Sequence, residues 1–140
     1  MRRAAPATLA AFAALAALAI SACGGEARDL FLVTRSGDVP GARLTLRVTD
    51  DGRASCNGKP LVDITSAQLI TAREAERDVG KPAKAQLRLA PGPQPVFSYR
   101  VRTEDGGVAW SDDSARQPQV LFKLAQLTRD VAKGPCHLAR

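Results

Sequence analysis

The stretch Arg43-Leu44-Thr45-Leu46-Arg47-Val48-Thr49 alternates strictly between polar and apolar side chains. A period of two is typical of a β-strand with one buried face, here the face of Leu44, Leu46 and Val48. Residues 29–34, upstream of it, are rich in apolar side chains and suit a partner strand. The intervening segment contains two glycines and a proline, which favour a turn. We therefore expect an antiparallel hairpin.

A second hairpin is expected further along the chain. Phe97, Tyr99 and Val101 alternate with polar residues, and the turn-forming residues 104–107 lead into the apolar residues 108–110. Tyr99 and Trp110 are expected to pack in the core or across strands, in preference to forming a ligand platform. A turn at residues 50–52 leads to a short extended segment that ends at Cys56.

Two helices are expected. Thr65 and Gln68 fit a capping box, and Gly80, with Pro82 just beyond, marks the end of that helix. The last helix begins near Pro118 and ends before Gly134-Pro135. Its apolar positions, Val120, Leu124, Leu127 and Val131, have helical spacing. The prediction is an α+β fold in which a small antiparallel sheet of two hairpins packs against one or two helices.

The region between the first helix and the second hairpin is less regular. Residues 81–89 are ambiguous, although Leu87 and Leu89 alternate with polar neighbours as an edge strand would. The prolines of residues 91–95 indicate a stiff linker or loop, since each removes a donor and fixes its own backbone angle. The acidic pairs Asp50-Asp51, Glu104-Asp105 and Asp112-Asp113 are expected to be solvated turn residues.

The N-terminus resembles a bacterial lipoprotein signal. Arg2 and Arg3 precede the apolar residues 7–20, a run shorter than the ~20 residues of a membrane-spanning helix. Ile20-Ser21-Ala22-Cys23 is similar to a lipobox. The resemblance implies a signal peptide at 1–22, lipidation (such as palmitate) of Cys23, a tether at 23–28 and one domain at 29–140. The location would be the extracytoplasmic face of the cell membrane. An ordinary secretory signal or an uncleaved anchor is the alternative.

Charge and cysteine content narrow the function classes. The net charge is +6, and it falls to +4 if Arg2 and Arg3 leave with the signal. The remaining charges form no basic cluster, which argues against nucleic-acid binding. Outside the cytoplasm, Cys56 and Cys136 are expected to form a disulfide. A metal or redox site using His137 is the less favoured reading, since zinc takes four N or S ligands and redox motifs use CxxC.

No catalytic constellation is evident, so we expect a non-enzymatic protein without cofactor or metal. The single histidine, His137, lies near the C-terminus, which disfavours serine or cysteine nucleophile arrangements.

Several short motifs resemble the emfourin family, small proteins that include an inhibitor of thermolysin-like metallopeptidases of the protealysin type. The motifs are Arg35-Ser36-Gly37, Gly41, Leu44-x-Leu46-x-Val48, Phe97-x-Tyr99, Asp105-Gly106, Asp112 and the final helix. Asp38 stands where that family usually has a second glycine. The resemblance implies an inhibitor, but it assigns no inhibitory residue on this chain.

Two functions follow as hypotheses. In the first, a membrane-held binding domain docks a protein partner, such as a metallopeptidase, through one loop. Glycine and proline limit the entropy that this loop loses on docking, and Val39 supplies an apolar tip. Its residues are Ser36, Gly37, Asp38, Val39, Pro40 and Gly41. The alternative hypothesis is that the loop is a simple hairpin connection without a binding role. In the second hypothesis, the protein is a structural or accessory envelope lipoprotein that contacts another envelope component or lipid headgroups.

Overall fold

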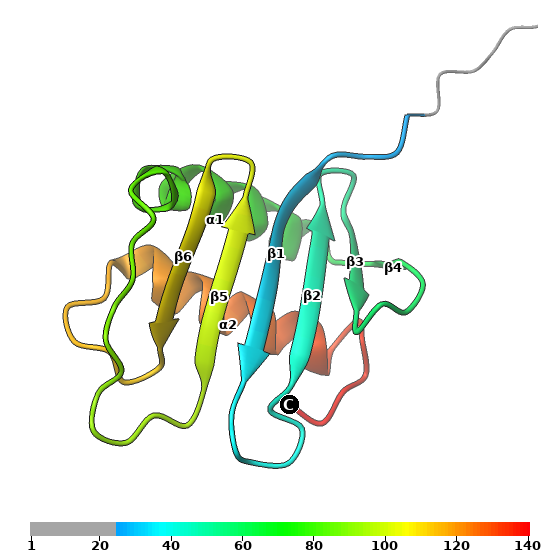
Figure 1. Ribbon diagram of the computed structural model, residues 1–140. Helices are drawn as coiled ribbons and strands as arrows, with labels where there is room; N and C mark the ends of the chain where they lie inside the picture. Colours follow the sequence, from blue (N-terminus) through cyan, green and yellow to red (C-terminus); the bar gives the residue numbers. More distant parts are fainter. Residues whose placement is uncertain (1–24) are drawn as a thin grey trace, which may run out of the picture.

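The computed structural model describes residues 25–140, so the expected signal peptide and Cys23 lie outside the described residues. One antiparallel sheet has the strand order β4-β3-β2-β1-β5-β6, and both helices cover the same face of it (Figure 1). The strands are β1 Asp29–Ser36, β2 Leu44–Thr49, β3 Arg53–Cys56, β4 Val62–Asp63, β5 Ser98–Thr103 and β6 Gly106–Ser111, and the helices are α1 Ser66–Lys84 and α2 Gln119–Lys133. The predicted α+β class is confirmed.

Both predicted hairpins form, and β1 joins them. Val33 of β1 lies opposite Leu46 of β2 on one side and Val101 of β5 on the other. β1 is therefore a central strand, although it comes first in the described chain. Because all three of these side chains are fully buried, they place the middle of β1 at the centre of the core.

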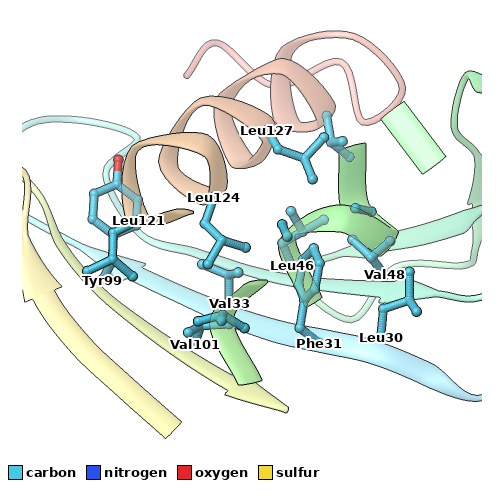
Figure 2. Close-up of a cluster of buried hydrophobic side chains, with 14 of the residues drawn as sticks. Leu30, Phe31, Val33, Leu46, Val48, Tyr99, Val101, Leu121, Leu124 and Leu127 are labelled. Carbon is cyan, nitrogen blue, oxygen red and sulfur yellow. The ribbon is translucent and has the colours of Figure 1, made fainter. Parts of the chain in front are cut away.

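The core lies between the sheet and the two helices, and α2 contributes its larger helical side chains. Leu121, Leu124 and Leu127 of α2 face Phe31 and Leu46 of the sheet, as Figure 2 shows. The predicted apolar stripe of this helix is buried over its whole length. Burying such side chains contributes about 1.5–3 kcal/mol each before conformational entropy is subtracted.

The start of α1 was predicted correctly and its end was not. The Thr65 side chain accepts a hydrogen bond from the backbone of Gln68 at 3.1 Å, and the Gln68 side chain accepts one from the Thr65 backbone at 2.9 Å. The helix continues past Gly80 to Lys84 and contains Pro82. Pro82 costs one helical hydrogen bond. Ala83, which follows it, is fully buried, and this packing favours an additional helical turn.

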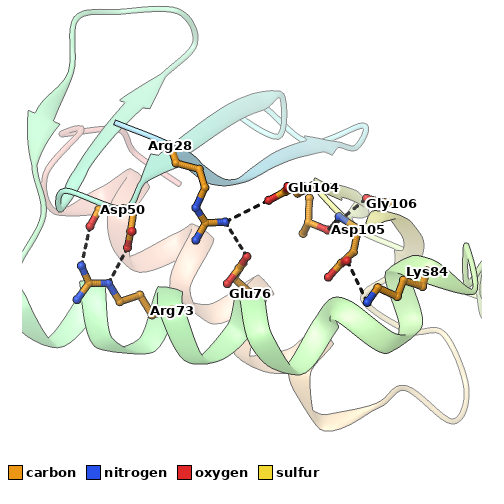
Figure 3. A network of polar contacts seen from close by, with 9 residues as sticks. Arg28, Asp50, Arg73, Glu76, Lys84, Glu104, Asp105 and Gly106 are labelled. Carbon is orange, nitrogen blue, oxygen red and sulfur yellow. Dashed lines mark hydrogen bonds and ion pairs between the residues drawn. The ribbon is translucent and has the colours of Figure 1, made fainter. Parts of the chain in front are cut away.

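Ion pairs fasten α1 to the turns at one end of the sheet (Figure 3). Arg73 Nε lies 2.8 Å from Asp50 Oδ1, and Lys84 Nζ lies 3.2 Å from Asp105 Oδ1. Exposed pairs of this kind contribute about 0–1 kcal/mol each, so they orient the helix more than they stabilise it. Two of the acidic turns expected to be merely solvated therefore hold a helix.

Two further connections complete the fold. Cys56 at the end of β3 forms a disulfide with Cys136, which follows α2, as expected from the sequence. Residue Arg88 forms a short parallel bridge with Ala109 of β6, so the ambiguous segment does run along the sheet edge.

Candidate functional site

The predicted docking loop, residues 36–41, comprises the last residue of β1 and most of the connection to β2. It lies at the opposite end of the sheet from the start of β1 (Figure 1). Asp38 and Pro40 are exposed, while Val39, expected at an exposed tip, is half-buried. Ala42 N donates to Val39 O at 3.1 Å, and Gly41 has a φ of +75°, a conformation that glycine adopts without steric cost. The loop is a tight, internally hydrogen-bonded turn.

The buried side chain of Arg35 holds this loop through hydrogen bonds to its backbone, a contact that we call the clamp. Its side chain is 3% exposed, Nε donates to Ala42 O at 2.9 Å, and Nη2 donates to Gly41 O at 3.2 Å and to Arg140 O at 3.1 Å. Its guanidinium also lies 5.0 Å from the centre of the Phe97 ring. Burial lowers the pKa of Arg35, and the neighbouring Tyr99 opposes this effect. An arginine side chain nonetheless keeps its proton in proteins, so the clamp stays charged.

The proline-rich segment, residues 91–97, is a second ordered loop beside the first. Gly92 N and Gln94 N donate to the two oxygens of Asp113 at 2.9 and 2.8 Å, and Val96 N donates to Asp112 Oδ1 at 3.0 Å. Prolines alternate with these residues, so every backbone N–H from 91 to 96 is bound to a carboxylate. Hydrogen bonds to ionised acceptors are the stronger kind.

The sequence predicts Asp112-Asp113 as a solvated pair, whereas both side chains accept backbone hydrogen bonds. A signal was present in the sequence. Alternating prolines leave backbone donors at every second residue of 91–96, and adjacent carboxylates are suited to accept from such a row. The partners lie 16 to 21 residues apart, so no local pattern connects them.

The two loops pack together and form one surface, which we call the loop end, residues 36–41 and 91–97. A Cβ added at Gly37 would lie 2.3 Å from Val96 O, so the two backbones meet at a position that admits only glycine. Val96 is 45% exposed. The loop end is therefore rigid and has an apolar side chain at its surface.

An aromatic cluster lies behind the loop end. The Tyr99 and Trp110 rings stack with centres 5.1 Å apart and planes at 12°, and Phe97 meets Tyr99 edge-on with a centre distance of 6.3 Å. Tyr99 and Trp110 are both buried and face each other across β5 and β6, which confirms their predicted packing role. Burial raises the pKa of Tyr99, and nearby Arg35 counteracts the increase.

The remaining candidate chemistry is dispersed. His137 is exposed, and its neighbour Cys136 is held in the disulfide. Within residues 25–140, no three His, Cys, Asp or Glu side chains lie close enough to hold a metal ion. None of the helices in that range is long and apolar enough to cross a membrane. No protein-family model, curated protein or solved structure matches the chain.

Proposed function

We propose that this chain is a lipid-anchored, extracytoplasmic protein whose non-catalytic domain docks a protein partner through the loop end. The observation that carries the proposal is the double clamping of that surface. Arg35 holds one loop, and Asp112 with Asp113 holds the other. A surface that is already ordered loses little conformational entropy on binding, so more of the contact energy appears as affinity.

The position of the loop end supports a role at a membrane surface. β1 has eight residues, Asp29–Ser36, and spans about 26 Å at the usual rise of a strand. An anchor at Cys23 would precede β1, whereas the loop end follows it. The domain would therefore present the loop end away from the membrane, where a protein partner can approach.

The resemblance to emfourins makes a thermolysin-like metallopeptidase the first partner to test. Residues 25–140 contain the whole sheet, both helices and the disulfide, so they are the fragment to use. Hydrolysis of a chromogenic peptide should slow when this fragment is present at about micromolar excess. An unchanged rate would refute the inhibitor function.

A matched pair of variants locates the docking surface. Val96→Asp places a charge on the loop end and should weaken inhibition at least about tenfold, since charges are poorly tolerated at interface centres. Ile70→Asp makes the same change at a 58% exposed position on α1 and should leave inhibition within about twofold. Equal effects of the two variants would count against the loop end.

Anchoring needs a separate test, because the domain could bind a partner without a lipid. Mass spectrometry of protein from the membrane fraction should find an acylated N-terminal peptide that begins at Cys23. A peptide that begins elsewhere and lacks acyl chains would contradict the anchor. That result would leave the docking proposal standing.

A second candidate function is that of an accessory envelope protein that contacts lipid headgroups, and the open sheet face favours it. Arg47 and Arg102 both lie opposite Leu32 on the face away from the helices, and Arg100 lies opposite Thr34. Arg47 is paired with Glu26 and Asp29, which reduces the charge of this face. Co-sedimentation with phosphatidylglycerol vesicles that is lost in the Arg100→Gln/Arg102→Gln variant would support it. Equal sedimentation with neutral vesicles would contradict this second function.

A further inference from the structure

A hollow of about 520 Å³ lies between α2 and the end of the sheet, next to the loop end. The buried Tyr99 and Trp110 line it on the sheet side. Phe122, Ala125 and Arg129 line it on the helix side, where their spacing follows one stripe of α2. This volume falls within the range of small-molecule sites in proteins.

Cations dominate the charge around this hollow. Arg35, Arg129, Lys133 and Arg140 line it, and Asp112 is the one acidic residue among the described residues that do. Asp112 already accepts a hydrogen bond from Val96. Arg129 and Lys133 are exposed and have no ion pair within the described part of the chain. The hollow therefore has an excess of positive charge that internal carboxylates do not neutralise.

One buried donor lacks an acceptor. Trp110 is 3% exposed, and its Nε1 has no hydrogen-bond partner among residues 25–140. Such an unsatisfied donor is unfavourable, and Trp normally finds an acceptor when it is buried. Tyr99 lies at the edge of the core with its hydroxyl directed away from Val101 (Figure 2). Both side chains line the hollow on its sheet side.

An apolar surface accompanies these donors. Phe122 is 52% exposed although it belongs to a helix whose other large apolar side chains are buried. Phe97 and Ala125 add further apolar surface within the hollow. A ligand that fits must therefore combine an apolar body with acceptor oxygens.

We propose that this hollow binds a small organic oxyanion with an apolar body. Arg129 and Lys133 would pair with the anionic group, while Phe97 and Phe122 would pack on the apolar body. An acceptor oxygen of the ligand can also take a hydrogen bond from the Tyr99 hydroxyl. This ligand site shares Phe97 with the loop end, but ligand binding in the hollow does not require a peptidase partner.

The test uses the only tryptophan of the chain as a reporter. In an amide-correlation NMR spectrum of residues 25–140, the Trp110 indole N–H gives a single indole signal. Titration with naphthoate should shift this signal, and the shift should fit a dissociation constant below about 1 mM. Naphthamide, which has the same shape without the charge, should bind about tenfold more weakly. Inorganic phosphate alone should leave the signal in place, because it lacks the apolar body.

Two double variants with the same change in net charge serve as a matched pair. Arg129→Gln/Lys133→Gln should weaken naphthoate binding about tenfold. Arg77→Gln/Lys81→Gln removes two exposed charges from α1 and should stay within about twofold of the unmodified domain. An indole signal that does not move with naphthoate would overturn the proposal. Equal affinities for naphthoate and naphthamide, or equal losses in both double variants, would overturn it too.

Discussion

Replacing Arg35 with methionine tests the clamp under the loop end. The change removes three hydrogen bonds from a charged donor to the backbone oxygens of Gly41, Ala42 and Arg140. It also removes the contact with the Phe97 ring. Ala42 is buried, so its oxygen loses a partner that water cannot replace.

The expected change in the free energy of unfolding follows from these lost contacts. Hydrogen bonds to charged groups contribute about 1.5–3 kcal/mol each, and a cation over an aromatic ring adds about 0.5–1 kcal/mol. Against this, methionine no longer requires a charge to be desolvated, and it buries apolar surface of its own. We expect Arg35→Met to lower the free energy of unfolding by about 2–3 kcal/mol.

Urea unfolding followed by the fluorescence of Trp110 measures this free energy. Arg100→Met is the matched control, because Arg100 is exposed on the neighbouring strand β5 and makes no side-chain hydrogen bond or ion pair within residues 25–140. It should stay within about 0.5 kcal/mol of the unmodified domain. The Ala42 amide, which closes the turn, should exchange faster in Arg35→Met alone. Equal stabilities of the two variants would refute the clamp.

Three further predictions concern the disulfide, the aromatic cluster and the proline-rich loop. Cys56→Ala/Cys136→Ala should lower the free energy of unfolding in urea by about 4.5 kcal/mol, because the bond closes a loop with a sequence separation of 80. Since burial raises the pKa of Tyr99, its contribution to stability is present below pH about 10 and is lost as the pH rises above it. Tyr99→Phe should remove that dependence, and absorbance titration of this only tyrosine checks the pKa. Asp113→Ala should cost about 1–2 kcal/mol and speed the hydrogen exchange of the Gly92 amide.

Each of these predictions has a control or an outcome that would contradict it. The unmodified protein, once its disulfide is reduced, should unfold at the same urea concentration as the double alanine variant. An unfolding midpoint that reduction leaves unchanged would contradict the estimated contribution of the disulfide. A tyrosine that titrates at its ordinary pKa would contradict the burial argument for Tyr99. Asp38→Ala changes an exposed aspartate on the loop end that accepts no hydrogen bond within residues 25–140, and it should leave the stability within about 0.5 kcal/mol. A similar loss in Asp38→Ala would contradict the anchoring role of Asp113.

The strands and helices that were predicted correctly depend on interactions between residues close in the sequence. The alternation of Leu44, Leu46 and Val48 fixes which face of β2 is buried, because successive side chains of a strand point to opposite faces. The Thr65 and Gln68 cap involves residues three apart, so it could be recognised directly. The end of α1 was misjudged because burial of Ala83, a tertiary contact, outweighed the local signals of Gly80 and Pro82.

The binding features of the domain depend on residues that are distant in the sequence. Arg35 reaches an oxygen of Arg140, 105 residues away, and Asp113 binds the backbone of Gly92, 21 residues before it. The hollow likewise requires α2 to lie beside the ends of β5 and β6. No periodic pattern marks such contacts in advance.

The sequence by itself therefore determined the hairpins, the two helices apart from the end of α1, and the pairing of Cys56 with Cys136, because these depend on side-chain periodicity, local capping and the small number of cysteines. The tertiary structure decided that β1 joins the hairpins, that two loops are clamped into one surface, and that cations surround an aromatic hollow. These features depend on which distant side chains are brought within hydrogen-bonding or packing distance when the sheet closes against α2.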